Sequence, residues 1–283
     1  MKSIVKYRGG KSRELFNFIK HMPEKYTTFI EPFVGGGALY FHLEPEKAII
    51  NDINNKLITF YNQLKYDYTT LITQLGELQN FYEQNQKEYD ELKQRYPDDR
   101  VKNKNEDLYY RLRDVFNYPN DTYLEGTIYY FINKTAYSGM IRYNKSGEYN
   151  VPFGRYRNFN TKLITEQHHR LLSRTEILCV DYSKIFNMAT GSDFMFLDPP
   201  YDCIFNDYGN MDFIDGFNED EHRRLAQDFR NLPCPTLMVV SKTPLTESLY
   251  TNYIADEYHK TYAVNIRNRF KSEAKHIIIK NYR

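Results

Sequence analysis

Residues 25–54 contain two short apolar runs with a glycine-rich turn and a helix-like segment between them, and this pattern constrains the fold more than any other feature of the chain. The first run, KYTTFIEPFV (25–34), is rich in β-forming residues, and three glycines follow it at positions 35–37. The segment ALYFHL then predicts the start of a helix, and KAIINDIN (47–54) predicts a second strand that ends at Asp52. A strand, a tight turn, a helix and a strand form the opening unit of a parallel α/β sheet.

The rest of the chain divides into a continuation of this sheet and an insertion. Later segments predict further strands and one helix: EILCVD (176–181), FMFLDPPY (194–201), TLMVVS (236–241) and HIIIK (276–280) as strands, and DEHRRLAQDFRNL (220–232) as the helix. Residues 60–130 are polar, helical in pattern and tyrosine-rich, whereas residues 133–160 have little periodicity, which is typical of a functional loop region. We therefore expect an α/β domain from residues 1–59 and 165–283, with a helical and loop insertion over residues 60–164.

Composition excludes several classes of protein. No run approaches the roughly 18 apolar residues that a membrane span needs. The amino-terminal segment MKSIVKYRGGKSR is basic and glycine-rich and lacks an apolar centre, so we expect no secretory signal there. The three cysteines, Cys179, Cys203 and Cys234, are far apart and form no Cys-x-x-Cys pair, which predicts free thiols in the cytoplasm and no metal site.

Charge is balanced overall but unevenly distributed. The formal net charge of the 283 residues is only +1. Residues 133–174 nevertheless hold eight basic residues against two acidic ones, and residues 257–283 hold seven against two. Basic stretches in a neutral chain fit a surface that faces a polyanion, and they fit an ordinary solvated face about equally well.

Asp198-Pro199-Pro200-Tyr201 at the end of an apolar strand is the most specific signal. In α/β sheets ligands bind outside the carboxyl ends of the strands. An aromatic amine is a poor nucleophile because its lone pair is delocalised into the ring. The carboxylate of Asp198 and the backbone carbonyl of Pro199 can each accept one of its N–H bonds and localise that pair, and proline holds the chain rigid. Tyr201 offers a flat face for an extruded base.

The glycine turn and Asp52 form a second signal. Glycines allow a tight turn after a strand and a close approach of the backbone to a nucleotide-like ligand. Asp52 lies 17 residues after Gly35 at the end of the next strand, where a carboxylate can accept hydrogen bonds from ribose hydroxyls. A helix N-cap is the other interpretation of Asp52, and the two are compatible.

The segment Arg8-Gly9-Gly10-Lys11-Ser12 lacks the first glycine of a phosphate-binding loop, because Val5 stands in its place. A turn that presents Lys11 to a carboxylate fits better, and a plain surface turn fits nearly as well. Asp181, at another strand end, is a candidate acceptor for the adenine amine of a cofactor.

Together these residues resemble the Dam-type, alpha-group DNA adenine-N6 methyltransferases, in order as well as in content. The matching segments are Lys6-Tyr7-Arg8-Gly9-Gly10-Lys11, Glu31-Pro32-Phe33-Val34-Gly35-Gly36-Gly37, GMIRYNKSGEYNVPFGRY (139–156), Asp198-Pro199-Pro200-Tyr201, and Gly216-Phe217 followed by Glu221-His222. The resemblance implies a Rossmann-like class I methyltransferase sheet with helices on both faces. It also implies that residues 1–59 and 165–283 bind S-adenosylmethionine and catalyse methyl transfer, and that residues 60–164 recognise the DNA target.

The resemblance further implies a role for individual residues. The catalytic set is Asp198, Pro199, Pro200 and Tyr201. The cofactor-binding set is Tyr7, Gly9, Gly10, Lys11, Phe33, Gly35, Gly37, Asp52, Asp181 and Asp198. The DNA-binding set is Lys6, Tyr137, Ser138, Arg142, Asn144, Pro152 and Arg155. Within it, Arg142 suits a bidentate contact to a guanine edge, and Tyr137 suits a wedge that helps to extrude the base.

Two departures from the family pattern bear on specificity. Tyr7 stands where relatives often have Trp, and stacking is expected to survive this change. Ser138 stands where relatives that methylate GATC have Asn, so GATC is the leading target sequence but is not fixed by the residues. The expected partner is double-stranded DNA, with a cognate restriction endonuclease as a further candidate. We expect a monomer or weak dimer without membrane association, located with the bacterial nucleoid or in a phage-infected host.

Other functions remain open on the sequence alone. Methylation of the exocyclic amine of cytosine has nearly the same chemistry, although the motif order favours adenine. Methyltransferases that act on glutamine in protein or on RNA more often have Asn where Asp198 stands. Nothing here supplies the hydride-transfer site of a dehydrogenase. A DNA-binding regulator with an inactive methylase fold is the alternative from another class, and the full catalytic set argues against it.

Overall fold

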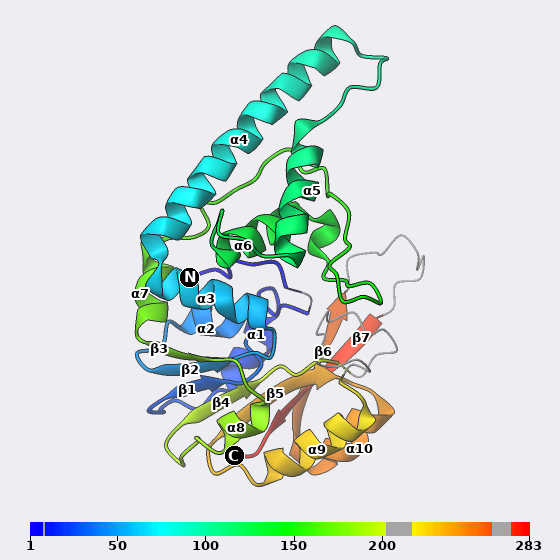
Figure 1. The fold of residues 1–283 in the computed structure, drawn as a ribbon. Helices are drawn as coiled ribbons and strands as arrows, with labels where there is room; N and C mark the ends of the chain where they lie inside the picture. Colours follow the sequence, from blue (N-terminus) through cyan, green and yellow to red (C-terminus); the bar gives the residue numbers. More distant parts are fainter. Residues whose placement is uncertain (8, 202–216, 262–272) are drawn as a thin grey trace.

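The computed structural model describes residues 1–283 except residues 8, 202–216 and 262–272. Its centre is a seven-stranded sheet in the order β3-β2-β1-β4-β5-β7-β6 (Figure 1). The strands are β1 (Phe29–Glu31), β2 (Ala48–Asn51), β3 (Thr175–Leu178), β4 (Phe194–Leu197), β5 (Thr236–Ser241), β6 (Ile254–Thr261) and β7 (Glu273–Lys280). The pairs from β3 to β5 are parallel, and β7 pairs antiparallel with both β5 and β6.

Both faces of the sheet are covered, because side chains on buried strands alternate between two apolar clusters. Phe194, Phe196 and Leu237 face one cluster, whereas Met195 and Met238 face the other. Alternation with a period of two is what a strand buried on both sides requires. The structure therefore confirms the expected α/β sheet with helices on both faces.

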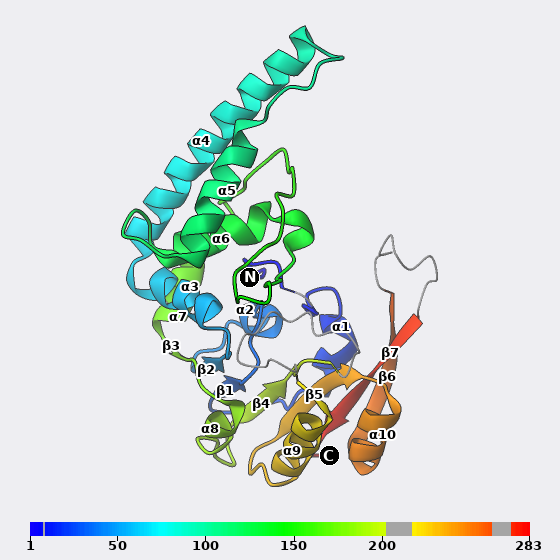
Figure 2. The same ribbon diagram turned by 45° about the vertical axis from the view of Figure 1, so that its right-hand side comes forward.

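Helices of the α/β part lie on opposite sides of the sheet (Figures 1 and 2). Those packed on the first cluster are α1 (Leu15–Phe18), α2 (Ala38–Leu43), α3 (Asn55–Tyr66) and α7 (Glu166–Ser173). Those packed on the second are α8 (Tyr182–Phe186), α9 (Glu219–Arg230) and α10 (Pro244–Tyr250). Short 3₁₀ turns η1 (Ile19–His21) and η3 (Thr251–Tyr253) follow α1 and α10.

The insertion contains three helices and an irregular segment. The helices are α4 (Tyr68–Arg95), α5 (Lys104–Asn117) and α6 (Glu125–Thr135), and the 3₁₀ turn η2 (Tyr137–Gly139) follows them. Buried residues of α4 end at Tyr82, and Figure 1 shows the rest of this helix rising away from the sheet beside α5. Residues 136–153 double back through two isolated bridges, Ala136 with Phe153 and Tyr143 with Tyr149. The predicted loop region is thus confirmed as irregular, whereas the strand β6 was not foreseen.

Candidate active site

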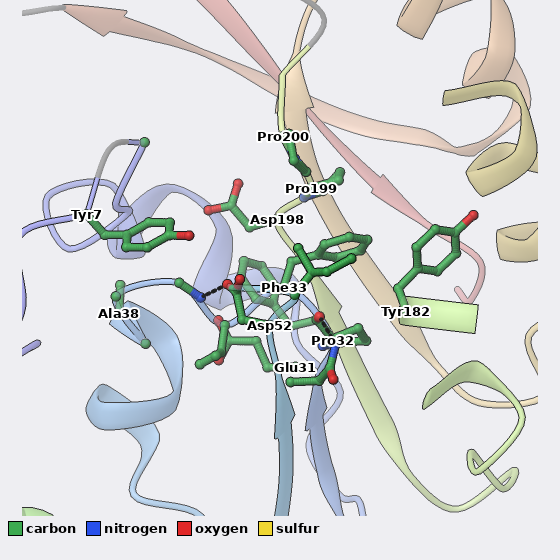
Figure 3. Close-up of a pocket in the computed structure, with 18 of the residues that line it drawn as sticks. Tyr7, Glu31, Pro32, Phe33, Ala38, Asp52, Tyr182, Asp198, Pro199 and Pro200 are labelled. Carbon is green, nitrogen blue, oxygen red and sulfur yellow. Dashed lines mark hydrogen bonds between the residues drawn. The ribbon is translucent and has the colours of Figure 1, made fainter. Parts of the chain in front are cut away.

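A pocket opens at the carboxyl ends of β1, β2 and β4, and it encloses about 870 Å³ including its open mouth. Figure 3 shows Tyr7, Asp52 and Asp198 around this space. The pocket is lined by every residue of the predicted catalytic and cofactor-binding sets, namely Tyr7, Gly9, Gly10, Lys11, Phe33, Gly35, Gly37, Asp52, Asp181, Asp198, Pro199, Pro200 and Tyr201. Residues from five separate parts of the chain therefore meet where an open α/β sheet binds its ligand.

The glycine turn leaves room for a ring and fixes a carboxylate. Gly35 has a φ of +45°, and a Cβ there would lie 2.8 Å from the Tyr7 ring. Its backbone N–H donates to Asp52 Oδ2 at 2.9 Å, and the backbone N–H of Asn54 donates to Asp52 Oδ1 at 2.9 Å. The N-cap of α3 is Asn54, whose side chain accepts from the Leu57 N–H, so the capping interpretation of Asp52 was wrong.

Lys11 connects the amino-terminal turn to the Asp-Pro-Pro-Tyr motif. Its ammonium donates to Asp198 Oδ1 at 2.5 Å, to the carbonyl of Gly9 at 3.3 Å, and to the hydroxyl of Tyr201. The expectation that this turn presents Lys11 to a carboxylate is confirmed. Burial raises the pKa of Asp198 and lowers the pKa of Lys11, and the opposite charge of each partner offsets the other's shift. The contact is an ion pair between a buried ammonium and a partly exposed carboxylate at the floor of the pocket.

Glu31 is a pocket residue that the functional analysis of the sequence missed. It ends β1, is 2% exposed, and lies beneath the glycine turn. Among the described residues its Oε2 has no hydrogen-bond partner. Burial, followed by the nearby charge of Asp198, raises the pKa of Glu31 well above its usual value. A buried polar atom that lines a pocket without a protein partner fits contact with a ligand donor. Its place at a strand end was a signal that could have found it.

A second missed group lies behind Tyr201. Glu14 accepts hydrogen bonds from Tyr258 and Lys260, both at 2.7 Å, and His276 Nδ1 lies 3.2 Å from the same carboxylate. Although burial opposes it, the contacts with His276, Lys260 and Tyr258 lower the pKa of Glu14 to about 2. The rings of His276 and Tyr201 are 5.2 Å apart. This cluster joins α1 to the β6–β7 pair, and no short sequence motif marks it.

The opposite wall of the pocket is aromatic and ends at Asp181. The ring of Phe33 lies 5.3 Å from that of Tyr182 and 6.2 Å from that of Phe217. Asp181 is the N-cap of α8 and forms an ion pair with Arg224 of α9. Hydrogen bonds from Ser183 and Arg224 outweigh burial and hold the pKa of Asp181 below its usual range. Asp181 is therefore a carboxylate that can accept a hydrogen bond from a ligand.

Lys6 lies between the pocket and the predicted DNA-binding segment. Its ammonium donates to the carbonyl of Lys134 at 3.1 Å and lies 4.0 Å above the ring of Tyr156. Its backbone N–H and carbonyl both bond to the side chain of Asn133. Burial, and then the nearby charge of Lys6, lowers the pKa of Lys134 to about 8. Two lysines thus meet at the end of α6.

The other predicted DNA-binding residues lie on one irregular segment and are largely exposed. The backbone N–H of Tyr137 donates to the carbonyl of Pro152 at 2.9 Å, which places these two residues side by side. Arg142 donates to the Asn150 side chain at 2.7 Å and to its carbonyl at 3.1 Å. Ser138 has a φ of +54°.

Asn144 and Arg155 of this segment also contact other residues of the insertion. Asn144 bonds to Glu148 through its side chain at 2.8 Å and accepts from the backbone N–H groups of Ser146 and Glu148. Arg155 lies 3.8 Å from Glu106. The predicted DNA-binding residues other than Lys6 are therefore exposed residues of one segment of the insertion, and Arg142, Asn144 and Arg155 are paired with other residues of the insertion.

The fold and this site define a class of protein: an α/β protein with a pocket at the carboxyl ends of its parallel strands and an Asp-Pro-Pro-Tyr motif in the wall of that pocket. A family model described as D12 class N6 adenine-specific DNA methyltransferase matches residues 7–266, and the chain belongs to that family. This membership favours adenine over the cytosine alternative.

Curated relatives agree with the family. The chain is 35% identical to the type II methyltransferase M.CviBI of Paramecium bursaria Chlorella virus NC1A over 100% of both chains. It is 34% identical to the type II methyltransferase M.MjaIII of Methanocaldococcus jannaschii, over 82% of this chain and 80% of the relative. It is 28% identical to the DNA adenine methylase of Salmonella typhi, over 96% and 90%.

Three further expectations concern metal sites, membrane-spanning helices and the cysteines. In the described ranges, no group of three or more His, Cys, Asp or Glu side chains is placed to hold a metal ion. No helix among the described residues is long and apolar enough to cross a bilayer. Cys234 is a buried free thiol. Arg8, Cys203, Gly216 and the part of the basic stretch at 262–272 lie outside the described residues.

Proposed function

We propose that this DNA adenine methyltransferase binds S-adenosylmethionine in the pocket and methylates N6 of an adenine extruded from double-stranded DNA. The observation that carries the proposal is the meeting of Asp198 with Lys11, Asp52 and the glycine turn in one pocket. Residues 1–59 and 165–283 form the catalytic and cofactor-binding domain, and residues 60–164 the target-recognition domain.

The pocket residues fit this cofactor. Asp52 uses one lone pair of each oxygen for a backbone N–H, and the remaining lone pairs suit ribose hydroxyls. Glu31 Oε2, which has no hydrogen-bond partner in the part of the chain that the structure describes, suits an ammonium group. The aromatic wall around Phe33 suits an adenine ring. S-adenosylmethionine, when bound, supplies an electrophilic methyl group on a sulfonium.

The catalytic residues act on the target amine. Asp198 accepts one N6–H, the carbonyl of Pro199 accepts the other, and Tyr201 stacks on the base. Lys11 keeps Asp198 ionised and oriented through the 2.5 Å contact to Oδ1, which leaves Oδ2 for the amine. Two acceptors in fixed positions pull the nitrogen toward a tetrahedral shape and direct its localised lone pair at the methyl group that the cofactor would supply. The C–S bond would break as the N–C bond forms, leaving a thioether, and the methylated amine would lose one N–H proton, so no covalent enzyme intermediate is needed.

The insertion reads the DNA. Arg142, Asn144, Pro152, Ser138 and Tyr137 contact the target, and Arg155 and Lys6 support the backbone contacts. Lys134 is a partly buried cation close to Lys6, and a phosphate there would compensate both charges. GATC is the proposed target, with Ser138 the residue most able to change it. The remaining proposals are a monomer or weak dimer in the cytoplasm and a cognate restriction endonuclease.

Long-read sequencing of DNA from cells that express the chain tests the function directly, because it reports the methylated base and its context. We expect N6-methyladenine in one short motif, and an absence of methyladenine would refute the proposal. Calorimetric titration with S-adenosylmethionine is expected to give micromolar binding. DNA affinity is expected to fall steeply with salt because the basic residues release counterions, and a flat response would exclude them from the interface.

A further inference from the structure

Asp181 is held unusually firmly for a partly exposed carboxylate. Its Oδ1 accepts the backbone N–H of Ser183 at 3.0 Å, the Ser183 hydroxyl at 2.5 Å and Nη2 of Arg224 at 2.5 Å. Its Oδ2 has one donor among the described residues, Nη1 of Arg224 at 3.4 Å. Three donors fill Oδ1, so the lone pairs of Oδ2 are the ones left for a ligand in the pocket that Asp181 lines.

Arg224 is itself fixed from several sides. Its Nη1 contacts Glu221 Oε2 at 3.0 Å, and its Nε lies 3.9 Å from Asp228. Its guanidinium lies 4.7 Å above the ring of Tyr182, which in turn packs on Phe33 of the aromatic wall. One side chain of α9 therefore holds both the carboxylate and the ring that border this end of the pocket.

We infer that Arg224 is the positioning residue that turns Oδ2 of Asp181 toward the 6-amino group of the cofactor's adenine, and so makes the site select a 6-aminopurine. This inference rests on the proposed binding of S-adenosylmethionine. An ionised carboxylate only accepts hydrogen bonds, so it binds the amine of adenine and repels the carbonyl oxygen of a 6-oxopurine. The selection depends on the angle of the carboxylate plane, and the fork of Arg224 sets that angle.

The test measures binding of two product analogues to the whole chain without DNA. S-adenosylhomocysteine carries the amine, and S-inosylhomocysteine carries a carbonyl at the same position. Wild type is expected to prefer the amine by at least about tenfold, the contribution of a charge-assisted hydrogen bond. Arg224→Met keeps an unbranched side chain beside Tyr182 but removes the guanidinium fork, and is expected to lower that preference by several-fold. Arg224→Gln is the second variant should the first fail to fold.

Two further variants serve as controls for the measured preference. Arg223 is the neighbouring residue, and among the described residues its ion-pair partner is Glu219 on the exposed side of α9. Arg223→Gln is expected to keep the wild-type preference. Asp181→Asn can turn its amide to donate to the carbonyl, so it is expected to lose or reverse the preference.

The possible outcomes distinguish the role of Arg224 from the proposed binding of S-adenosylmethionine on which it rests. An unchanged preference in both Arg224 variants, with the preference lost in Asp181→Asn, overturns the role of Arg224 alone. A preference retained in Asp181→Asn overturns the assignment of Asp181 as well. Failure of wild type to bind either analogue overturns the proposed cofactor, and the inference falls with it.

Discussion

The floor of the pocket and the segment 136–157 are organised in opposite ways. At the floor, partners come from distant parts of the sequence: Lys11 and Asp198 are 187 residues apart, and Lys11 is 1% exposed. In the segment, two of the proposed DNA-reading side chains pair with near neighbours in exposed contacts: Arg142 bonds to Asn150 eight residues on, and Asn144 to Glu148 four residues on. Its other ties, such as that of Arg157 to Asp90, stay within the insertion.

This difference separates two tasks. The floor is fixed by the core before any ligand arrives, which is what lowering a reaction barrier by preorganisation requires. The exposed charged side chains of the segment pair within the insertion and must exchange those partners for DNA when it binds, so they can vary without disturbing the floor of the pocket. Changes at the floor should therefore alter the rate of methyl transfer, and changes in the segment should alter which sequence is chosen.

Asp198→Ala is expected to give the largest effect. Removing the proposed acceptor of the amine hydrogen should lower kcat by about a thousandfold, the size seen when one preorganised group is lost. Transfer of labelled methyl groups to DNA measures it, and circular dichroism checks that the variant is folded. The matched control is Asp193→Asn, at the other end of β4, where the carboxylate bonds to Thr190. Near-normal turnover in Asp198→Ala would show that the floor of the pocket does not control the rate of methyl transfer, and the contrast with the segment would then fail.

Lys11→Met is expected to shift the pH dependence of kcat/KM for methyl transfer. Burial already raises the pKa of Asp198 and the charge of Lys11 opposes that shift, so without Lys11 the pKa of Asp198 rises further. The carboxylate form accepts the amine hydrogen best, so the rising limb of kcat/KM should move to higher pH. We expect a loss of about a hundredfold at pH 7. Lys11→Arg keeps the charge and should keep the limb in place. An unshifted limb in Lys11→Met would contradict the role of the pair.

Arg142→Ala is expected to act on sequence choice instead. Losing a bidentate base contact should cost about 1–3 kcal/mol of discrimination at one position of the target. A methylation assay on a library of sequences measures the loss, while turnover on saturating cognate DNA should change little. Asn150→Ala removes the side-chain partner of Arg142 but keeps the Arg142 guanidinium. It should therefore relax the preference for the target sequence less than Arg142→Ala does. Intact preference in Arg142→Ala would assign the reading to another residue.

The same contrast explains what the sequence could reveal. Strand ends and glycine turns are local patterns, so Asp198, Asp52 and the strands that they follow were accessible from short motifs. Glu14 and His276 are 262 positions apart and meet only because β7 pairs with β5 and β6. Arg224 lies in an ordinary amphipathic helix, where nothing distinguishes it from Arg223. The pairing of Arg142 with Asn150 was not foreseen either, because it depends on two isolated bridges outside any regular strand.

Ser138→Gly is expected to give the smallest effect, and it tests whether the segment's backbone is set by its own residues. Ser138 has a φ of +54°, in the left-handed region that costs a non-glycine residue about 1–2 kcal/mol. Glycine removes this cost but loses more entropy on folding, so the net gain in the free energy of unfolding should be about 0.5–1 kcal/mol. Urea unfolding measures it. Ser138→Ala keeps Cβ and should gain nothing, whereas Ser138→Asn should gain part of it because Asn tolerates this region. A destabilised Ser138→Gly would mean that the hydroxyl or contacts beyond the segment hold this turn, and the two regions would then differ less than their hydrogen bonds indicate.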